Sequence, residues 1–533
     1  MNFLLIDGWG DYSVRSDDNR PSKTSPLFLY LANILITNNH NIRFIDARDF
    51  HFTYESLNEH LKYNGYDYII FNTNVDNVDT VLRSQSRIPN QATKLYTYSI
   101  NENFSDYIKN SKFKNLIFDE RLNFKENAHN IYSSLFENAE VKFESSFVLN
   151  YHLYQDLKYK SVLLNIGTGC LRKCNYCGIG NSTVQYRDIS NIMEEIKQLL
   201  DKGIQYFHIS NHNFCQSKSF MEAFCKELIK RFHNRDFTWS CYILPEYFIE
   251  YIQLIPLMKE AKISKIEISC ESGSCEILRQ LNISDNTEQI KMITQTIMDN
   301  EIPLISYHFI MGSIFETVAS LIETRKCIIE LLEKTNYLCD IQINAFYPEY
   351  QDNPSIYQEI ILKRTDFVVP SKSLSIEELK YSLSTLKKEI QVLRKANVPQ
   401  IHLKRQHDFI RAKDYGINSQ VYIENLAYTP ASFMYRKKMQ TKYFYYSWEI
   451  KDNIEEYSPF ILSSDYIKPE VLKNDFSNLD RVLLVQLKYG LTILELATWL
   501  KKESNGTLGY PDLLKVLNNL ENQKRICYVK YLK

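Results

Sequence analysis

The stretch "SVLLNIGTGCLRKCNYCGIGN", residues 161–181, decides how the central part of this chain is interpreted. Its first half is an apolar run that ends in a glycine turn, as expected of a buried β-strand and the loop that follows it. Its second half places Cys170, Cys174 and Cys177 in the spacing C-x3-C-x2-C. The question is which chemistry three thiols can support directly after a strand.

The composition limits the classes of protein to which the chain can belong. Its 533 residues are enough for roughly three domains. With 63 Lys and Arg against 64 Asp and Glu, the net charge of −1 does not favour a nucleic-acid partner. We find neither a signal peptide nor an apolar run of membrane-spanning length, so we expect a cytoplasmic protein with no membrane contact. In that compartment the 11 cysteines are expected to be free thiols.

Two series of strands and helices predict the fold class, which is α/β. Residues 1–150 alternate short apolar strands with helices, which predicts a Rossmann-like, doubly wound sheet. Residues 155–360 contain six further strands, each followed by a helix, which predicts a partial (β/α)6 TIM barrel. Catalytic groups of such barrels lie at the carboxyl ends of the strands, where the three cysteines are found.

The remainder of the chain is predicted to be mainly helical. Residues 361–455 read as a helical and irregular extension. Residues 456–533 contain three helical patterns and a strand pair, which we interpret as a small winged-helix-like domain. Few Lys or Arg lie in 480–512, so a DNA-binding role is not favoured over a packing role or a peptide-binding role.

The cysteine spacing permits three kinds of site. A structural zinc site needs four ligands, so His212 or Cys215 would have to be recruited from elsewhere. A redox pair would use Cys174 and Cys177 and leave Cys170 without a role. Three thiolates also suit a [4Fe–4S] cluster in which one iron stays open for a further ligand.

Further motifs give the third interpretation a specific resemblance. The cysteine spacing with Tyr176 before the last cysteine resembles the radical S-adenosylmethionine (SAM) superfamily. The segments "CESGSCEILRQLN" (270–282), "IMGSIFET" (310–317) and "FYPEYQDNP" (346–354) resemble motifs after the fourth, fifth and sixth strands of its subgroup with an N-terminal cobalamin-binding-like domain. The resemblance covers residues 1 to about 360. Ile314 stands where the subgroup commonly has Pro, and the third segment lacks the usual Gly.

The resemblance implies an activity and a set of cofactor contacts. A reduced [4Fe–4S] cluster on Cys170, Cys174 and Cys177 would pass one electron, supplied by a donor such as flavodoxin or ferredoxin, to bound SAM. The resulting 5′-deoxyadenosyl radical would abstract hydrogen from a peptide or small-molecule substrate. Each implied SAM contact could equally be a packing residue of the barrel. These contacts are Tyr176, Gly178, Ile310 and Gly312 near the adenine, Asn211 and Asn213 near the amino group, and Glu271 and Ser272 at the ribose or carboxylate.

The front domain raises the question of cobalamin. "SPLFLYLANILITNNHNIRFIDARDF", residues 25–50, resembles the start of the cobalamin-binding fold. The motif D-x-H-x-x-G is absent, because His51 follows Asp46 by five residues, and the Gly-Gly after the fourth strand is replaced by "YTYSINENF". We therefore expect a degenerate domain that keeps its fold, with cobalamin as an open alternative.

The sequence also predicts a hydrogen donor and permits three alternative functions. Cys215, Cys241, Cys270 and Cys275 lie near strand ends and could quench a substrate radical, and Cys241 is the predicted donor. The first function is hydrogen abstraction from a peptide or natural product, with ribosomal peptide maturation favoured because the C-terminal domain loosely resembles the winged-helix peptide-recognition elements of such maturases. The second is a cobalamin-dependent radical SAM methyltransferase. The third is a zinc-bearing winged-helix regulator that binds nucleic acid.

Overall fold

The computed structural model divides the chain into two compact units, residues 1–398 with 410–419, and residues 399–409 with 420–533. Its described residues are 1–8, 24–47, 57, 60–61, 64–74, 77–88, 92–101, 105–137, 139–154, 162–211, 214–346, 370–397, 444–447, 457–461, 479, 483, 493–522 and 526–531. Each unit is described by itself.

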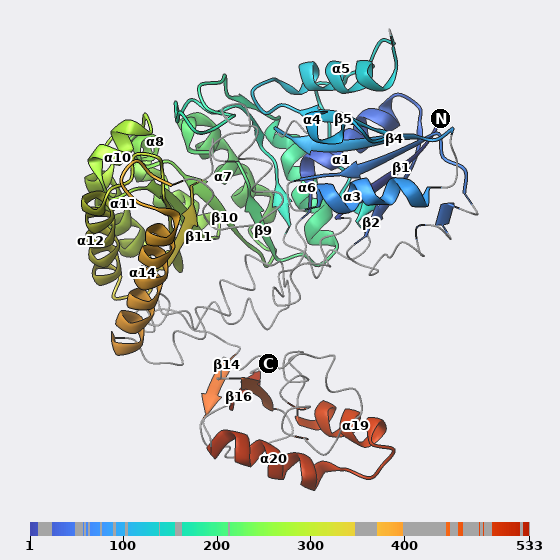
Figure 1. Ribbon diagram of the computed structural model, residues 1–533. Helices are drawn as coiled ribbons and strands as arrows, with labels where there is room; N and C mark the ends of the chain where they lie inside the picture. The colour runs from blue at the N-terminus through green and yellow to red at the C-terminus, as the bar shows by residue number, and fades with distance from the viewer. Residues whose placement is uncertain are drawn as a thin grey trace. The chain divides into compact units, whose positions relative to one another are not determined.

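The first unit begins with a five-stranded parallel sheet, which we call the front sheet (Figure 1). Its order is β2-β1-β3-β4-β5, so the strand order reverses beside β1, as in doubly wound folds. The strands are β1 (Asn2–Asp7), β2 (Asn41–Asp46), β3 (Tyr68–Asn72), β4 (Lys94–Ile100) and β5 (Phe113–Phe118). The Rossmann-like part of the predicted fold is confirmed as a parallel α/β sheet.

Helices cover both faces of the front sheet because its strands are apolar on both faces. On one face, Phe3 and Ile70 belong to the core that also contains α1 and α5; on the other, Leu4 and Phe71 belong to the core that contains α3 and α4. The helices are α1 (Pro26–Thr37), α3 (Val78–Ser84), α4 (Ser105–Ile108) and α5 (Phe124–Leu135). An Asn123–Glu126 capping box begins α5, so two amide groups at its amino end are satisfied.

The second sheet of this unit, which we call the barrel sheet, has six parallel strands. Their order is β13-β12-β11-β10-β9-β6, so the sheet is an open, partial barrel, as the sequence predicts. The strands are β6 (Leu163–Leu164), β9 (Tyr206–Ile209), β10 (Thr238–Ile243), β11 (Ile263–Glu271), β12 (Leu304–Met311) and β13 (Asp340–Ala345). A short antiparallel pair, β7 (Gly167–Thr168) and β8 (Gln185–Tyr186), brackets the cysteine segment.

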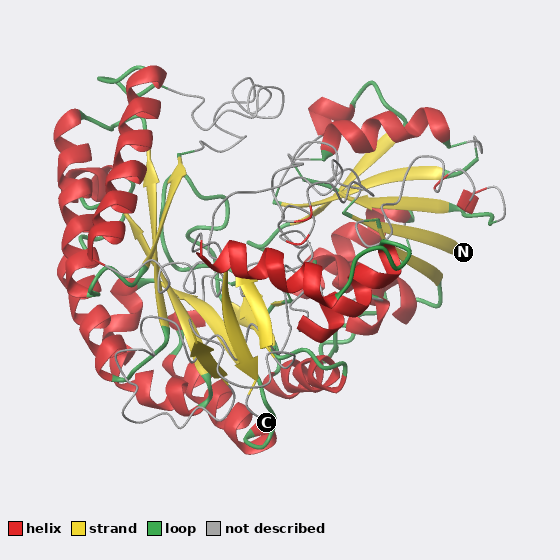
Figure 2. Cartoon of the chain, turned by 90° about the horizontal axis from the view of Figure 1, so that it is seen from below, coloured by secondary structure: helices red, strands yellow, loops and turns green. Residues whose placement is uncertain are grey.

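Helices line the outer side of the barrel sheet (Figure 2). Alternate strand residues, such as Trp239 and Ile266, belong to the core packed against those helices. The helices are α6 (Ile189–Asp201), α7 (Lys218–Phe232), α8 (Pro245–Phe248), α9 (Ile255–Glu260), α10 (Cys275–Gln280), α11 (Thr287–Asp299), α12 (Val318–Lys334) and α14 (Ile376–Asn397).

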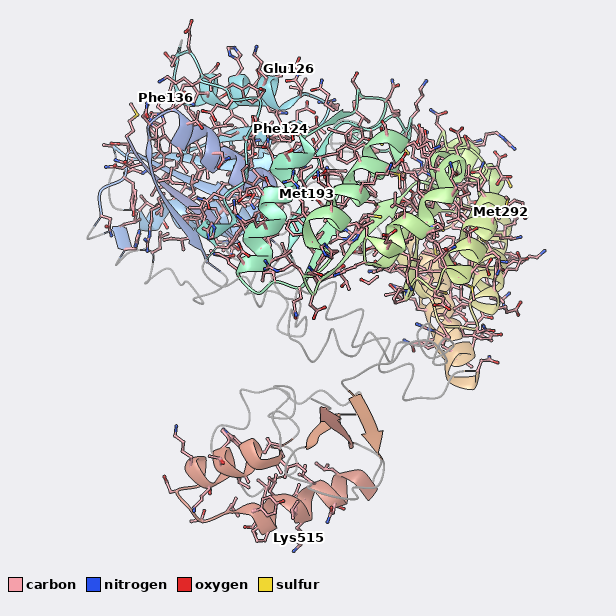
Figure 3. The ribbon with its side chains drawn as sticks, turned by 180° about the vertical axis from the view of Figure 1, so that it is seen from behind. Phe124, Glu126, Phe136, Met193, Met292 and Lys515 are labelled. Atoms are coloured by element: carbon pink, nitrogen blue, oxygen red, sulfur yellow. The ribbon has the colours of Figure 1, made fainter. Side chains whose placement is uncertain are left out.

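One hydrophobic core runs from the front sheet to the barrel sheet and contains both Phe124 of α5 and Met193 of α6 (Figure 3). An ion pair between Arg187 and Glu195 lies within this junction, with side-chain exposures of 2% and 0%. Arg187 also donates to the carbonyl of Phe147, and the amide of Leu149 donates to Glu195. Arg187 therefore ties the chain between the two sheets to the first barrel helix.

Among the residues that the structure describes, the second unit includes helices α19 and α20 and a three-stranded antiparallel sheet of order β14-β16-β15. These elements are α19 (Ile493–Glu503), α20 (Tyr510–Asn522), β14 (Phe444–Ser447), β15 (Tyr457–Ile461) and β16 (Ile526–Tyr531). Because β14 precedes residue 456, the sheet extends across the predicted domain boundary, and the winged-helix-like domain stays a prediction. No described helix in either unit is both long enough and apolar enough to span a bilayer.

Candidate active site

The three-cysteine segment is a loop that closes on itself by backbone hydrogen bonds. The amide of Asn181 donates to the carbonyl of Arg172 at 2.7 Å, and the amide of Ser182 donates to that of Cys170 at 2.9 Å. In return, the amide of Cys170 donates to the Ser182 hydroxyl at 2.9 Å. Residues 170–182, which we call the cysteine loop, are therefore held in a defined shape by their own hydrogen bonds.

Glycines allow the chain to approach itself at this loop. A Cβ atom at Gly167 would lie 2.2 Å from the carbonyl oxygen of Gln185, and one at Gly169 would lie 2.0 Å from that of Thr183. Gly169 also has a φ of 82°, a left-handed conformation that favours glycine. The sequence G-T-G before Cys170 is therefore required by backbone contact between β7 and the returning strand.

The far side of the cysteine loop is fastened to the end of α10, which follows the fourth-strand motif. The Asn175 side chain donates to the carbonyl of Gln280 at 2.7 Å, and its amide donates to that of Leu281 at 3.2 Å. Asn282 reaches back and donates to the carbonyl of Lys173 at 2.7 Å. Two motifs about 100 residues apart in sequence are thus held side by side.

The three thiols differ in their surroundings. Cys170 is buried, whereas Cys174 and Cys177 are half-buried. The Gln216 side chain donates to the Cys170 sulfur at 3.3 Å and accepts from the amide of Leu171 at 3.0 Å. Burial raises the pKa of Cys174 to about 12, although the Arg172 guanidinium opposes this shift. A bound metal would reverse the effect, since a coordinating thiol is deprotonated.

A buried arginine inside the loop carries the main electrostatic contacts of the site. Arg172 Nε lies 2.7 Å from Glu246 Oε1, and its Nη1 donates to Glu271 Oε1 at 2.7 Å. Burial alone would lower the pKa of Arg172, but the two carboxylates raise it, so the arginine stays charged. Glu271 ends β11 with a φ of 60°, a left-handed conformation that aims its backbone away from the strand.

The residues predicted near the adenine lie beside an apolar cluster. Tyr176 packs against Phe346 with ring centroids 5.6 Å apart, and Ile310 contacts the same cluster. Gly312 directly follows β12 with a φ of 91°, and its amide donates to Glu316 at 3.2 Å. Gly178 lies half-buried within the cysteine loop. Their role as SAM contacts stays a prediction.

Two other predicted contacts have structural partners. Asn211 donates to the carbonyl of Gly167 at 3.0 Å and accepts from the amide of Ile166 at 2.8 Å, so it fixes the strand that leads into the cysteine loop. The Ser272 hydroxyl lies 3.0 Å from that of Thr324. Asn213 lies outside the described residues. These contacts give no support to Asn211 or Ser272 as direct SAM ligands.

The inner face of the barrel sheet carries a network of ionisable side chains. Glu267 of β11 lies 2.7 Å from His308 Nε2 of β12, 3.6 Å from His208 Nδ1 of β9 and 3.2 Å from Lys265 Nζ. Burial would raise the pKa of Glu267, but Lys265 and the two histidines lower it well below its usual range. The ring of Tyr242 stands edge-on to both imidazoles at about 5 Å. Sequence reasoning did not identify this network.

The predicted hydrogen donor Cys241 lies on the other face of the barrel sheet. Its strand neighbour Ser240 lies 2.7 Å from His208 on the inner face, so period-two alternation places Cys241 on the helix-facing side. Cys241 is fully buried in the hydrophobic core. Cys215 and Cys270 are also fully buried, and Cys275 is exposed. The structure therefore gives no support to Cys241 as a radical-quenching residue.

The donor set of the cysteine loop suits an iron–sulfur cluster better than a single ion. Ten of the 11 cysteines, namely those whose side chains the structure describes, are free thiols. No group of three His, Cys, Asp or Glu side chains among the described residues is placed to hold one metal ion. A [4Fe–4S] cluster makes a different demand, because each thiolate binds a separate iron and the sulfurs need not converge on one point. Three thiols in one loop are therefore the kind and number of donors that such a cluster takes.

The comparison with protein families agrees with this donor set. Residues 164–328, which span the cysteine loop and strands β6 to β12, match the model described as the radical SAM superfamily. The barrel is a radical SAM domain. The chain is accordingly a radical SAM enzyme, and radical SAM domains work with a [4Fe–4S] cluster and SAM. Of the predicted features, the family and its two cofactors are confirmed.

The chain also resembles solved structures. The radical S-adenosylmethionine methyltransferase TsrM from Kitasatospora setae has a TM-score of 0.50 at 13% identity, with 64% of this chain and 72% of that chain covered. The cobalamin-dependent S-adenosylmethionine radical enzyme OxsB has a TM-score of 0.49 at 13% identity, with 73% and 61% covered. No curated protein matches the sequence. At this level of identity, the likeness to TsrM concerns the fold alone.

Besides the Glu267 network, three residues around the cysteine loop were not predicted from the sequence, namely Arg172, Gln216 and Glu246. Arg172 lies inside the cysteine motif, and its importance becomes visible only through its two carboxylate partners. Glu246 follows the end of β10, and a charged residue at the carboxyl end of a barrel strand is a usable signal. Gln216 carries no such signal, because it ends a short 3-10 helix (Phe214–Gln216) and does not directly follow a strand.

Proposed function

We propose that this radical SAM enzyme abstracts hydrogen from a peptide or related natural-product substrate, with Cys170, Cys174 and Cys177 as the cluster ligands. The observation that carries the proposal is the cysteine loop, which is closed by its own hydrogen bonds and fastened to α10 within the matched domain. When bound, the cluster and SAM supply a 5′-deoxyadenosyl radical, while the protein positions the reactants and excludes water.

Different residues of the chain contact or position different parts of the cofactors in this proposal. Tyr176, Gly178, Ile310 and Gly312 form the proposed adenine side, which is apolar where Tyr176 meets Phe346. Glu271 is the proposed contact to the ribose or to the carboxylate of SAM. Arg172 holds Glu271 and Glu246 in a buried ion-pair network and so fixes the direction of the Glu271 carboxylate. Gln216 orients the loop through Cys170 and Leu171.

The inner network of the barrel supports a polar substrate. His208 and His308 keep side-chain exposures of 12% and 15%, whereas Glu267 between them is almost fully buried. Imidazoles that are held by a buried carboxylate can donate to or accept from a substrate group. We place the reacting part of the substrate against these histidines, within the open side of the partial barrel.

The second unit supports a peptide as the substrate. In the order β14-β16-β15, strands β14 and β15 are the edges of the three-stranded sheet. An extended peptide can add a strand to such an edge through main-chain hydrogen bonds. Ribosomal peptide maturation is therefore the favoured setting, with flavodoxin or ferredoxin as the electron donor.

Anaerobic reconstitution tests the proposed chemistry directly. We expect about four irons and four sulfides per chain, and formation of 5′-deoxyadenosine and methionine when SAM and dithionite are added. Substrate deuterated at the abstracted position should transfer deuterium into 5′-deoxyadenosine. An absence of SAM cleavage by protein with a full complement of iron would refute the proposal.

A second candidate is a cobalamin-dependent radical SAM methyltransferase. The fold likeness to TsrM, a radical SAM methyltransferase, supports this second candidate. That likeness covers 64% of this chain. Reconstitution with hydroxocobalamin followed by gel filtration separates the two candidates. A corrinoid absorbance that stays with the protein, together with methyl transfer, would establish the methyltransferase, and a colourless protein would eliminate it.

The zinc-bearing regulator receives no support from the site. No described set of three suitable side chains is placed around a single ion. The family match also assigns the cysteine loop to an enzyme domain. If protein purified under anaerobic conditions contains iron and no zinc, the zinc-bearing regulator is eliminated.

A further inference from the structure

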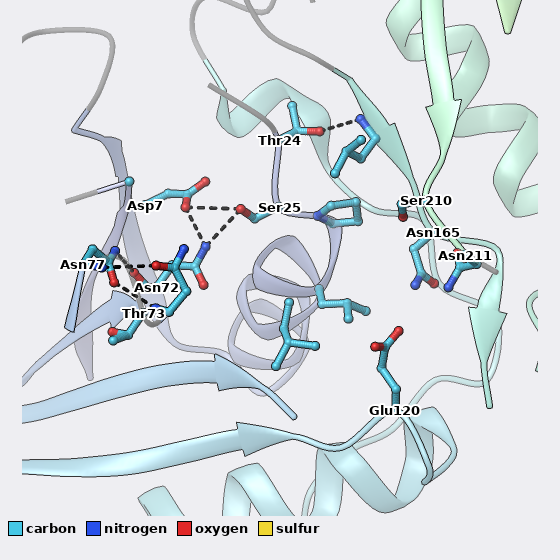
Figure 4. A pocket seen from close by; sticks show the side chains of 16 residues that line it. Asp7, Thr24, Ser25, Asn72, Thr73, Asn77, Glu120, Asn165, Ser210 and Asn211 are labelled. Atoms are coloured by element: carbon cyan, nitrogen blue, oxygen red, sulfur yellow. Dashed lines mark hydrogen bonds between the residues drawn. The ribbon is translucent and has the colours of Figure 1, made fainter. Parts of the chain in front are cut away.

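A cavity of about 410 Å³ lies between the carboxyl ends of the front-sheet strands and the first strand of the barrel (Figure 4). Asp7, Asn72 and Glu120 line it from the front sheet, and Asn165 and Asn211 line it from the barrel. The strand order of the front sheet reverses between β1 and β3 at this edge. Doubly wound sheets bind their ligands at such a switch point, so the cavity is a candidate binding site.

The described lining of the cavity is acidic or neutral. It contains two carboxylates and no Lys, Arg or His among the described residues. One oxygen of Asp7 accepts from the Ser25 hydroxyl at 3.2 Å and from Asn72 Nδ2 at 2.7 Å, and the other accepts from the Tyr154 hydroxyl at 2.5 Å. Since Ser25 is the N-cap of α1, Asp7 already places a negative charge beside the helix end that would attract an anionic ligand.

Two acceptors that face the cavity invite a donor. The Asn165 side chain is 3% exposed, and its Nδ2 donates to the carbonyl of Gly167 at 3.2 Å, but its Oδ1 has no partner. Glu120 accepts from Asn101 at 2.8 Å through Oε2. Figure 4 shows Glu120 and Asn165 on opposite sides of the same space. A buried acceptor without a partner costs free energy that a ligand N–H group can recover.

A corrinoid does not fit this cavity. The phosphate of cobalamin's nucleotide tail would face Asp7 and Glu120 with no described basic side chain to compensate. The described residues therefore disagree with cobalamin as the occupant.

We propose that this cavity binds a small ligand with a primary amine, which donates to Asn165 Oδ1 and to the Glu120 carboxylate. The site is joined to the radical SAM machinery through the backbone. The amide of Gly169 donates to the carbonyl of Glu120 at 2.8 Å, and Asn165 precedes Cys170 by five residues. An occupant of the cavity thus contacts the strand and the turn that carry the cysteine loop.

Ligand-observed NMR tests the site without any turnover, so its outcome is independent of the proposed function. The probes are phenethylamine and 3-phenylpropionate, which are similar in size and opposite in charge, each at millimolar concentration. We expect phenethylamine to bind and 3-phenylpropionate not to bind. No binding of phenethylamine, equal binding of the two probes, or hydroxocobalamin that stays with the protein through gel filtration would overturn the proposal.

Two variants assign the binding to the cavity. Asn165→Leu and Glu120→Gln should each weaken phenethylamine binding by about tenfold, as expected for the loss of one hydrogen bond to a charged group. Glu140→Gln, which removes an exposed carboxylate, should leave binding unchanged. Unchanged phenethylamine binding in both cavity variants would contradict the proposed contacts.

Thermal unfolding distinguishes a binding role from a structural one. Asn165→Leu removes an acceptor that has no partner, and the Gly167 carbonyl keeps Asn211 as a donor at 3.0 Å. We therefore expect the melting temperature to stay close to that of the wild type while binding is lost. A lower melting temperature with unchanged amine binding would show that Asn165 serves the fold alone and would overturn its assignment.

Discussion

The front sheet and the barrel sheet have the same kind of construction and different chemistry at their ends. Both are parallel, and both carry polar side chains where their strands end. In the barrel these are charged groups in buried ion pairs, namely Arg172 with Glu246 and with Glu271. At the front sheet Asp7 is held by Ser25 and Asn72, which carry no charge. Topology thus sets where a site forms, and the side chains decide what it does.

The largest expected effect would show that the cofactor chemistry belongs to the barrel alone. Replacement of Cys170, Cys174 or Cys177 by Ala should reduce iron from about four per chain to background and should abolish formation of 5′-deoxyadenosine. Cys225→Ala, which changes a buried thiol of α7, is the matched control and should keep both signals. SAM cleavage by any of the three loop variants would contradict the assignment.

The next effect concerns the junction between the two sheets. Arg187→Met leaves Glu195 as a buried charge without its partner, so the free energy of unfolding should fall by about 3–5 kcal/mol. Arg187→Met with Glu195→Leu removes both charges and should recover most of that loss. Urea denaturation of the three proteins measures the difference. A double variant as unstable as the single one would show that the loss of stability comes from altered packing and not from the unpaired charge.

The charged interior of the barrel should respond to acid. Glu267→Gln leaves Lys265 without its carboxylate partner and should cost about 3 kcal/mol at pH 7. Because the pKa of Glu267 lies well below 4.5 in the folded protein, its stabilisation is complete above that pH and is lost as the pH falls through the folded pKa. The stability difference between wild type and variant should therefore shrink below pH 4.5. A difference that is constant with pH would contradict the ion-pair network.

A comparison of Gly169 with Gly203 separates the cost of a left-handed backbone from the cost of a close contact at the cysteine loop. Gly169 and Gly203 have similar φ values of 82° and 78°, but only a Cβ at Gly169 would meet another atom, at 2.0 Å. Gly203→Ala should cost about 1–2 kcal/mol. Gly169→Ala should cost more and should also lower the iron content, because it displaces Cys170. Equal losses in the two variants would mean that the close contact is relieved elsewhere.

The smallest expected effect concerns Cys241. Because Cys241 faces the helices, Cys241→Ala should keep the rate of product formation and lower the free energy of unfolding by about 1 kcal/mol. The measurement compares the amount of product formed from deuterated substrate with the amount of SAM cleaved. Continued SAM cleavage without product would restore Cys241 as the hydrogen donor.

Much of the first unit follows from local sequence patterns. Apolar strands followed by helices predicted both parallel sheets, because hydrophobic periodicity is a local property. The spacing of Cys170, Cys174 and Cys177 likewise predicted the cluster chemistry that the family match supports, because three neighbouring thiols need no distant residue to be noticed.

The individual contacts of the site could not be predicted in this way. Asn211 stays a predicted SAM contact, but its bonds to the backbone of Ile166 and Gly167 became visible only once strand pairing brought those groups within reach. Cys241 read as a donor near a strand end, and only the alternation of β10 placed it on the helix-facing side. A shift of one residue reverses the face of a strand, and sequence alone does not fix that register.

The sequence by itself determined the kind of chemistry, a parallel α/β scaffold with a three-thiol loop at a strand end. The tertiary structure decided which side chains surround it: the Arg172 network, the Glu267–His308 pair, and the amide-lined cavity beside Asn165. The reason is physical. Strand and loop patterns depend on neighbours in sequence, whereas charge pairing and unpartnered buried groups depend on residues that only the packing of two sheets brings together.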